Sequence, residues 1–441
     1  MINIKCLSRY KNILNRSKMH CLIGVFFVGV AAFVCEESKL KKNNDLVQAI
    51  FRDDLTLVKS ILLRNPDPNV INDNGDTPLH QLFQAGNDVA RHIKEILQMF
   101  LDNFVDVTMP NKQGEEPFVY IDRITSSIPK KLSFAGILVL HGASMDTRSS
   151  VNITNGISTE TATLFDLVVQ TGGTPGVEAF LAWWGWLVSP ETLQSAKNVA
   201  ALLKYTDIVT VLEKKDAFIT ENHVDTLDPE WRHPHTGLDL LSMLVLKKDI
   251  SLVKRLLSRK TRTFDINQKT GSLFSKAIDN TYTPSDSDVF DFSQAGVTTF
   301  SGGIQFGYTP LHLAVLQRDL SMTQFLIDQG AKTTIAADNG NTPLHCIMYI
   351  NPLYSSANND LILRLAQILL KNGADINAKN KKGDTLFHII IQRDAKDLFV
   401  PLWSQYKQKL SQNTKKSILQ KANSCYHIKN YLVNTGELVR K

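Results

Sequence analysis

Cysteine is scarce in this chain, with five in 441 residues. Three of the five fall within the first 35 residues, and no two are spaced as Cys-x-x-Cys. The sequence therefore excludes a disulfide framework and a structural zinc site of the usual spacing. It also lacks the GxxxxGK(S/T) and GxGxxG phosphate loops, the HExxH zinc motif and the GxSxG nucleophile motif. We therefore expect no catalytic residue, no metal site and no cofactor.

Three remaining features are compatible with chemistry but have a simpler interpretation. Cys346 follows His345, yet it stands where a small apolar residue of a helix is expected. The His-Pro-His sequence at 233–235 is typical of a loop before a helix rather than of a metal site. The tryptophan-rich segment 183–186 could line a groove or a membrane, and we interpret it as core packing.

Long apolar runs are scarce too, and the main one is residues 21–35, CLIGVFFVGVAAFVC. As a helix it would span roughly 22 Å, less than the ~30 Å hydrocarbon core of a membrane. Basic residues precede it and Glu36 follows, so three interpretations stay open: an N-terminal anchor, a secretory signal cleaved near residues 30–32, or a buried helix. The first makes the protein membrane-associated, and the second makes it periplasmic.

Positive charge is concentrated at the two ends of the chain, although the whole carries only +6. Residues 1–20 hold five basic and no acidic residues, and residues 401–441 hold eight basic residues and one glutamate. The residues between therefore carry a small net negative charge. This distribution argues against nucleic acid as a partner of the central body.

The strongest positive signal is an internal repeat. The hexapeptide GDTPLH at 75–80 recurs as GYTPLH at 307–312 and GNTPLH at 340–345, with a degenerate copy, GDTLFH, at 383–388. The second and third copies are 33 residues apart, and the fourth follows after 43, an excess that matches the turn-rich segment 351–360. A second signature ending in Gly-Ala recurs between them, at 326–331 and 369–374.

The hexapeptide has the chemistry of a helix start. Threonine is a good N-cap because its hydroxyl accepts a backbone N–H of the first turn. Proline is well tolerated at the next position, where its missing N–H costs nothing. Apolar residues then follow at helical spacing, and Gly330 and Gly373 stand where a left-handed residue ends a helix. We interpret the histidines of the hexapeptides as structural residues that bond to neighbouring backbone: His80, His312, His345 and His388.

These motifs resemble ankyrin repeats, which have a 33-residue period and a T-P-L-H opening. The resemblance is close over 307–400, good over 69–106 and faint over 113–260. It implies an all-α solenoid of stacked helix-turn-helix units with short hairpin loops, irregular in the middle. The expected parts are a leader with the apolar segment (1–40), a cap and repeats (41–146), a degenerate helical region (147–278), an acidic flexible insertion (279–306), regular repeats (307–400) and a basic helical cap (401–441).

A stacked array of this kind implies a non-enzymatic scaffold that binds a partner protein through its concave surface, as a monomer. In the family the hairpin tips and the inner helices face the partner. Carried over, the predicted partner-binding residues are Asp73, Asp76, Gln84, Tyr308, Leu316, Gln317, Asp338, Asn341, Tyr349, Lys381, Lys382, Asp384, Gln392 and Arg393.

The irregular units and the apolar N-terminus are similar in style to ankyrin-repeat effectors that intracellular bacteria deliver into host cells, which would make the partner a host protein and the chain secreted. The alternatives are an enzymatic activity in the degenerate region 145–300 and a periplasmic ankyrin protein.

Overall fold

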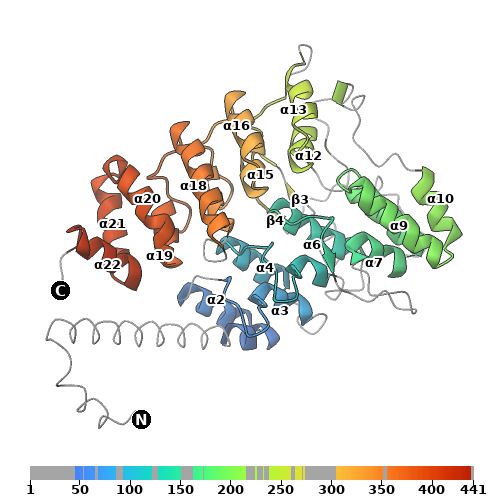
Figure 1. Cartoon of the computed structure of the whole chain (residues 1–441), viewed down its shortest axis with the longest axis horizontal. Coiled ribbons are helices and arrows are strands. Elements are labelled where there is room, and N and C mark those ends of the chain that lie inside the picture. The colour runs from blue at the N-terminus through green and yellow to red at the C-terminus, as the bar shows by residue number, and fades with distance from the viewer. Residues whose placement is uncertain are drawn as a thin grey trace, which may run out of the picture.

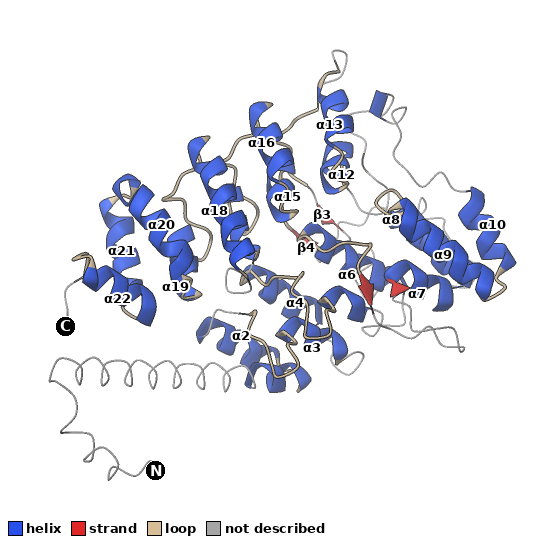
Figure 2. Cartoon of the chain, viewed as in Figure 1, coloured by secondary structure: helices blue, strands red, loops and turns tan. Residues whose placement is uncertain are grey.

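The structure is a computed structural model. It describes residues 45–52, 54–64, 68–85, 93–121, 128–149, 162–171, 173–214, 224–225, 232, 238–259, 264–270, 272–273, 304–350 and 355–438. Figure 2 shows that helices dominate this part of the chain, as the sequence predicts. Its N-terminal helices are α2 (Leu55–Arg64), α3 (Pro78–Gln84), α4 (Ile93–Asp102), η3 (Pro117–Tyr120) and α6 (Ile128–Leu140).

Four short helices begin with the same cap: α3, α15 (Pro310–Leu316), α17 (Pro343–Cys346) and α19 (Leu386–Gln392). In each, the backbone N–H of the threonine donates to Nδ1 of the histidine three residues on, over 3.0 to 3.2 Å. Since Nδ1 accepts, Nε2 carries the proton and donates to the next unit, as from His312 to the Asn341 carbonyl at 3.1 Å. The structural role predicted for the histidines is confirmed.

Each short inner helix is followed by an outer helix that runs back beside it. The outer helices of the C-terminal half are α16 (Leu320–Asp328), α18 (Ser356–Lys371) and α20 (Lys396–Tyr406). Their apolar residues recur at helical spacing, so one face of each is buried, as with Met322 and Leu326 of α16. The inner helices are buried almost all round because they pack between two neighbouring units. Burying one leucine side chain contributes about 1.5–3 kcal/mol.

A further pair precedes α15, although it lacks the hexapeptide. Asp239 replaces the threonine, and its carboxylate accepts the backbone N–H of Ser242 at 2.8 Å at the start of α12 (Leu240–Leu246). The outer helix is α13 (Ile250–Leu257), which buries Val253 and Leu256. α12 packs against α15. This unit, within the region of faint resemblance, therefore stacks on the regular repeats.

The middle of the chain is helical but less regular. It contains α7 (Leu164–Thr171), α8 (Gly173–Trp184), α9 (Pro190–Leu202) and α10 (Thr206–Lys214), and α7 packs against both α8 and α9. Trp184 and Trp186 are buried, and Nε1 of Trp184 donates to the Leu132 carbonyl at 3.1 Å. Core packing is confirmed for these two tryptophans, whereas the side chain of Trp183 lies outside the described residues.

The described residues contain two short antiparallel pairs of strands. β1 (Arg148–Ser149) pairs with β2 (Ala162–Thr163), and β3 (Ser272–Leu273) pairs with β4 (Ile304–Gln305). The second pair places Leu273 beside Ile304. Of the insertion predicted at 279–306, residues 279–303 lie outside the described residues, and 304–306 lead directly into the first regular repeat.

The helix pairs of the C-terminal half stand side by side along an arc. Figure 1 shows this arc from α12 to α22, with α2, α3, α4 and α6 on its inner side and α7 to α10 at one end. The chain therefore folds back on itself: its N-terminal units lie against the concave side of its C-terminal units.

The last two helices are α21 (Gln412–Ala422) and α22 (Tyr426–Asn434). They follow α20, which runs through the boundary predicted between residues 400 and 401. At the other end, the predicted anchor or signal at 21–35 lies outside the described residues. Within the described residues, no helix combines the length and the apolar character that crossing a membrane requires.

Candidate protein-binding surface

The hairpin tips of successive repeats are built by asparagines. Asn380 Oδ1 accepts the backbone N–H groups of Lys382 and Asp384, both at 3.0 Å, and Asn72 and Asn111 close their own turns in the same way. Neighbouring tips are then joined by backbone bonds, such as that from Lys381 N–H to the Asn339 carbonyl at 3.0 Å. The tips thus form two stacked edges, one in the N-terminal units, where Lys112 N–H donates to the Asn74 carbonyl, and one in the C-terminal units.

Glycine is required where two tips approach. Gly340 has φ +81°, and a Cβ on it would lie 2.5 Å from the backbone nitrogen of Lys381. Gly373, at the end of α18, has a similar φ of +88° but open space around it.

The predicted tip residues fall into three groups. Asp73, Lys381 and Lys382 are exposed. Asp338 and Asp384 are half-buried, and Asp384 pairs with Lys421 of α21 at 2.9 Å. Two are buried between tips, since Asp76 accepts a bond from Asn111 and Asn341 accepts one from Asn380, both at 3.0 Å.

The predicted inner-helix residues are mostly covered by the chain itself. Gln84 and Gln392 are half-buried, whereas four others are buried: Leu316, Gln317, Tyr349 and Arg393. Tyr308, predicted at a hairpin tip, is buried as well. An isolated array would leave these positions on its concave face, as the resemblance implies. Here the N-terminal units occupy that face, so these side chains meet residues of the same chain, and partner binding at them stays a prediction.

We call this internal contact the seam; it joins residues 98–108 and 139–142 to residues 306–393. At its centre, the Arg318 guanidinium pairs with the Asp106 carboxylate at 2.7 Å. The Asp106 side chain is 2% exposed and that of Arg318 is 24% exposed. Arg393 donates to the Phe104 carbonyl, and the Phe104 ring lies 5.1 Å from the Tyr349 ring.

The end of α6 forms the second half of the seam. His141 Nδ1 donates to the Ile137 carbonyl at 2.8 Å, so Nε2 accepts from the Tyr308 hydroxyl at 3.0 Å. Gln317 donates its amide N–H to the Val139 carbonyl at 2.5 Å. The approach is so close that a Cβ on Gly142, with φ +108°, would lie 2.7 Å from the Leu316 carbonyl oxygen.

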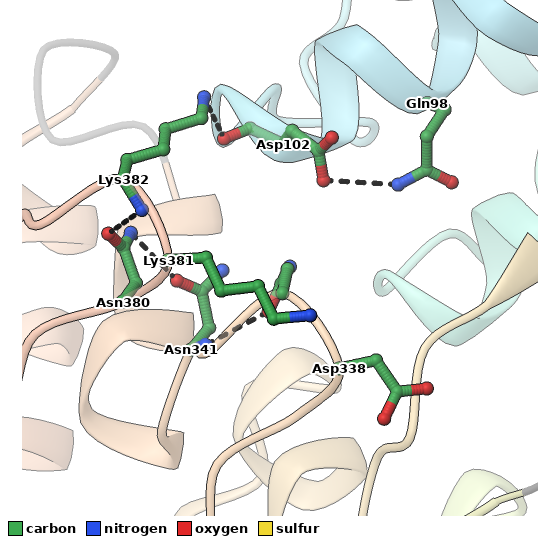
Figure 3. A pocket seen from close by; sticks show the side chains of 8 residues that line it. Gln98, Asp102, Asp338, Asn341, Asn380, Lys381 and Lys382 are labelled. Carbon is green, nitrogen blue, oxygen red and sulfur yellow. Dashed lines mark hydrogen bonds between the residues drawn. The ribbon is translucent and has the colours of Figure 1, made fainter.

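A polar cavity of about 320 Å³ opens at the edge of the seam. Figure 3 shows it between the end of α4 and the C-terminal tips. Its lining consists of carboxylates, amides and lysines: Gln98, Asp102, Asp338, Asn339, Asn341, Asn380, Lys381 and Lys382. Such groups bind polar ligands through hydrogen bonds.

Burial shifts several pKa values at this surface. It raises the pKa of Asp102 and lowers that of Lys382, which lies beside it. Burial also lowers the pKa of His141 to about 4 and that of His312 to about 3, so both rings are neutral at pH 7.

The described residues lend no support to reactive chemistry at the features noted in the sequence. Burial raises the pKa of the Cys346 thiol far above its usual value, which suppresses the reactive thiolate. Among the described residues, no three His, Cys, Asp or Glu side chains lie close enough together to hold a metal ion. Residues 233–235 lie outside the described residues.

Sequence reasoning missed the partners that the N-terminal units supply to the seam: Phe104, Asp106, His141 and Gly142, with Arg318 opposite. One signal was available, because the sequence VLHGA at 139–143 ends in Gly-Ala like the signatures at 326–331 and 369–374. The signature places Gly142 at a helix end, but it does not indicate what the helix end contacts.

Comparison with known proteins identifies the repeats. A sequence model of the ankyrin repeat matches residues 306–338 and 339–381. The mouse protein Rabankyrin-5 is 37% identical over 89 residues, which are 19% of this chain and 7% of that protein. The chain therefore matches only a small part of that relative. The crystal structure of the ankyrin repeat domain of Bcl-3, a member of the IkappaB family, is 17% identical, and the match covers 78% of this chain and 92% of that one with a TM-score of 0.24. A score this low carries no argument.

Stacked helix pairs with a common cap define the fold as a helical-repeat solenoid. The chain contains ankyrin repeats, and the match to the family lies in residues 306–381.

Proposed function

We propose that this chain is a non-enzymatic scaffold that binds a partner protein. The observation that carries the proposal is the stacking of the hairpin tips, which the capped inner helices hold at fixed spacing. A rigid edge loses little conformational entropy when a partner docks. Asp73 on the N-terminal edge and Lys381 on the C-terminal edge present charge to solvent, and we expect these groups to make the first contacts with the partner.

The test begins with proximity labelling by the full chain to identify a partner, followed by measurement of its affinity. The double variant Asp73→Ala, Lys381→Ala should weaken binding roughly fivefold or more, because it removes two exposed charges from the tips. The matched control is Asp328→Ala, Lys371→Ala, which removes one charge of each sign from exposed ends of outer helices. Equal affinities for the two double variants would contradict the proposal.

Three narrower points complete the proposal. The chain acts as a monomer, its partner is a host protein, and the protein is either tethered to a membrane through residues 21–35 or secreted as an effector. The style of the sequence supports these points, and fractionation of the native organism tests the localisation. A periplasmic location and an enzymatic activity in residues 145–300 remain alternatives that no described residue favours.

A further inference from the structure

The concave face of the regular repeats already holds a ligand-like segment, residues 102–106 of the same chain. The sequence of this segment is Asp-Asn-Phe-Val-Asp, and it begins at the last residue of α4. Phe104 has a left-handed φ of +60°, which turns the backbone and directs neighbouring carbonyl groups toward the repeats. The segment is therefore an acidic turn with an aromatic residue at its centre.

Three cationic residues of the array bind this turn. Lys382 Nζ donates to the Asp102 carbonyl at 2.8 Å and to Asn103 Oδ1 at 2.9 Å. Arg393 donates to the Phe104 carbonyl, and Arg318 binds the Asp106 carboxylate.

An aromatic contact completes the recognition, since the Phe104 ring packs on Tyr349. The repeats therefore contact the charge, the backbone carbonyls and the aromatic ring of the segment together, as a protein does when it binds a peptide.

The seam combines apolar burial with features of a separable interface. Phe104 and Tyr349 are buried in one apolar cluster that includes both halves. Around them the ion pair and the side-chain hydrogen bonds are polar contacts that water can replace, and the 320 Å³ cavity lies open along one edge. Nε of Arg318 is buried, yet it has no hydrogen-bond partner among the described residues. Contacts between domains with this polar character resemble transient protein–protein interfaces.

We infer that the concave face formed by Arg318, Tyr349, Lys382 and Arg393 is a recognition surface for acidic turns with a central aromatic residue, and that residues 102–106 occupy it in cis. A partner protein that carries such a turn binds this face by displacing the chain's own segment. Tethering gives the segment an effective concentration in the millimolar range, so the closed form keeps weak competitors out. This inference rests on the proposed scaffold function and names the chemistry of the partner.

The test uses a fluorescent peptide of residues 99–109, MFLDNFVDVTM, as the probe. Its binding is measured by fluorescence anisotropy on four full chains: wild type, Asp106→Ala, Gly142→Ala and the control Asp328→Ala. Asp106→Ala breaks the ion pair by removing the carboxylate of the chain's own segment. Gly142→Ala pushes the end of α6 away from Leu316 by steric contact and leaves all cationic groups in place. Hydroxyl-radical footprinting of Tyr349 reports opening of the seam, and the buried Trp403 of α20 reports global unfolding.

We expect oxidation of Tyr349 to rise in the two opened chains while Trp403 stays protected. The peptide should bind these chains at least tenfold more tightly than it binds wild type or Asp328→Ala. Adding Arg318→Ala to an opened chain, or replacing Asp106 of the peptide by alanine, should abolish the gain. If Asp106→Ala does not fold, Gly142→Ala decides the outcome.

Two results would overturn the inference. A gain below tenfold, or one that survives Arg318→Ala, would show that the face does not recognise the turn. Protection of Tyr349 unchanged in both variants would show that the segment is a fixed part of the core. In either case, loss of partner affinity in the tip variant Asp73→Ala, Lys381→Ala would still support the scaffold function, so the two failures are distinguishable.

Discussion

The bonds that His312 makes between two repeats lead to a quantitative prediction. His312 accepts the Thr309 N–H at 3.1 Å and donates to the Asn341 carbonyl at 3.1 Å, and all three residues are buried. His312→Ala leaves that N–H and that carbonyl without their partner. Each buried unsatisfied group costs about 1–3 kcal/mol, and loss of the ring adds a cavity. We therefore expect the free energy of unfolding to fall by about 3–5 kcal/mol.

The assay is urea unfolding followed by far-ultraviolet circular dichroism, with His427→Ala as the matched control. The His427 side chain is 54% exposed and pairs with Asp394 on the surface, so its loss should cost less than about 1 kcal/mol. Because a repeat array is stabilised by contacts between neighbours, a split transition in His312→Ala would also agree with the reasoning. A single transition displaced by less than about 1 kcal/mol would refute it, since the bonds to Thr309 and Asn341 would then contribute little.

Three further predictions follow from the same structure. In a double-mutant cycle, Arg318→Ala should lower the free energy of unfolding by about 3 kcal/mol, because it leaves the buried Asp106 carboxylate without its cation. Adding Asp106→Ala removes that unpaired carboxylate and should restore at least about 1 kcal/mol. Additive losses in urea unfolding would contradict this. Gly340→Ala should lower the free energy of unfolding by about 3 kcal/mol and Gly373→Ala by about 1–2, since both are left-handed but only the first meets a neighbouring backbone; equal losses would count against the steric argument. Lowering the pH from 7 to 5 should reduce the free energy of opening the seam by about 2 kcal/mol through His141, so Tyr349 should become easier to oxidise. The released ring takes up a proton below pH about 6.5, whereas the buried ring has a pKa of about 4, so the seam loses stability as the pH falls between these values. A flat pH profile of Tyr349 oxidation would exclude this linkage.

The local part of the fold could be predicted because its determinants are close together in the sequence. Threonine, proline and histidine of the hexapeptide cap their own helix. The 33-residue spacing from Thr309 to Thr342 predicts that the two units are equivalent and stack on each other. The unit at Asp239 follows the same local rule, since aspartate caps a helix as threonine does. In each case the interactions that decide the structure lie within about one repeat.

The seam could not be predicted because it depends on how far the array curves and where the middle helices α7 to α10 direct the chain. Arg318 and Asp106 are 212 residues apart, and no period relates them. Phe104 and Arg318 also sit at left-handed turn positions, with φ of +60° and +61°. A sequence motif for a helix end indicates such a turn, but it does not show that its side chain meets a distant unit.

The prediction of partner-binding residues and the burial of those residues have a common physical origin. Tyr308 and Tyr349 are large aromatic groups, and Arg393 is a strong hydrogen-bond donor, so a concave face that exposed all three would favour a partner. A tethered segment of the same chain reaches that face at a much higher effective concentration than a separate protein. The composition of the face therefore favours the proposed binding, whereas the path of the chain determines which turn occupies the face in the folded molecule. For this reason, a partner of this face has to compete with residues 102–106, and its affinity depends on how readily the seam opens.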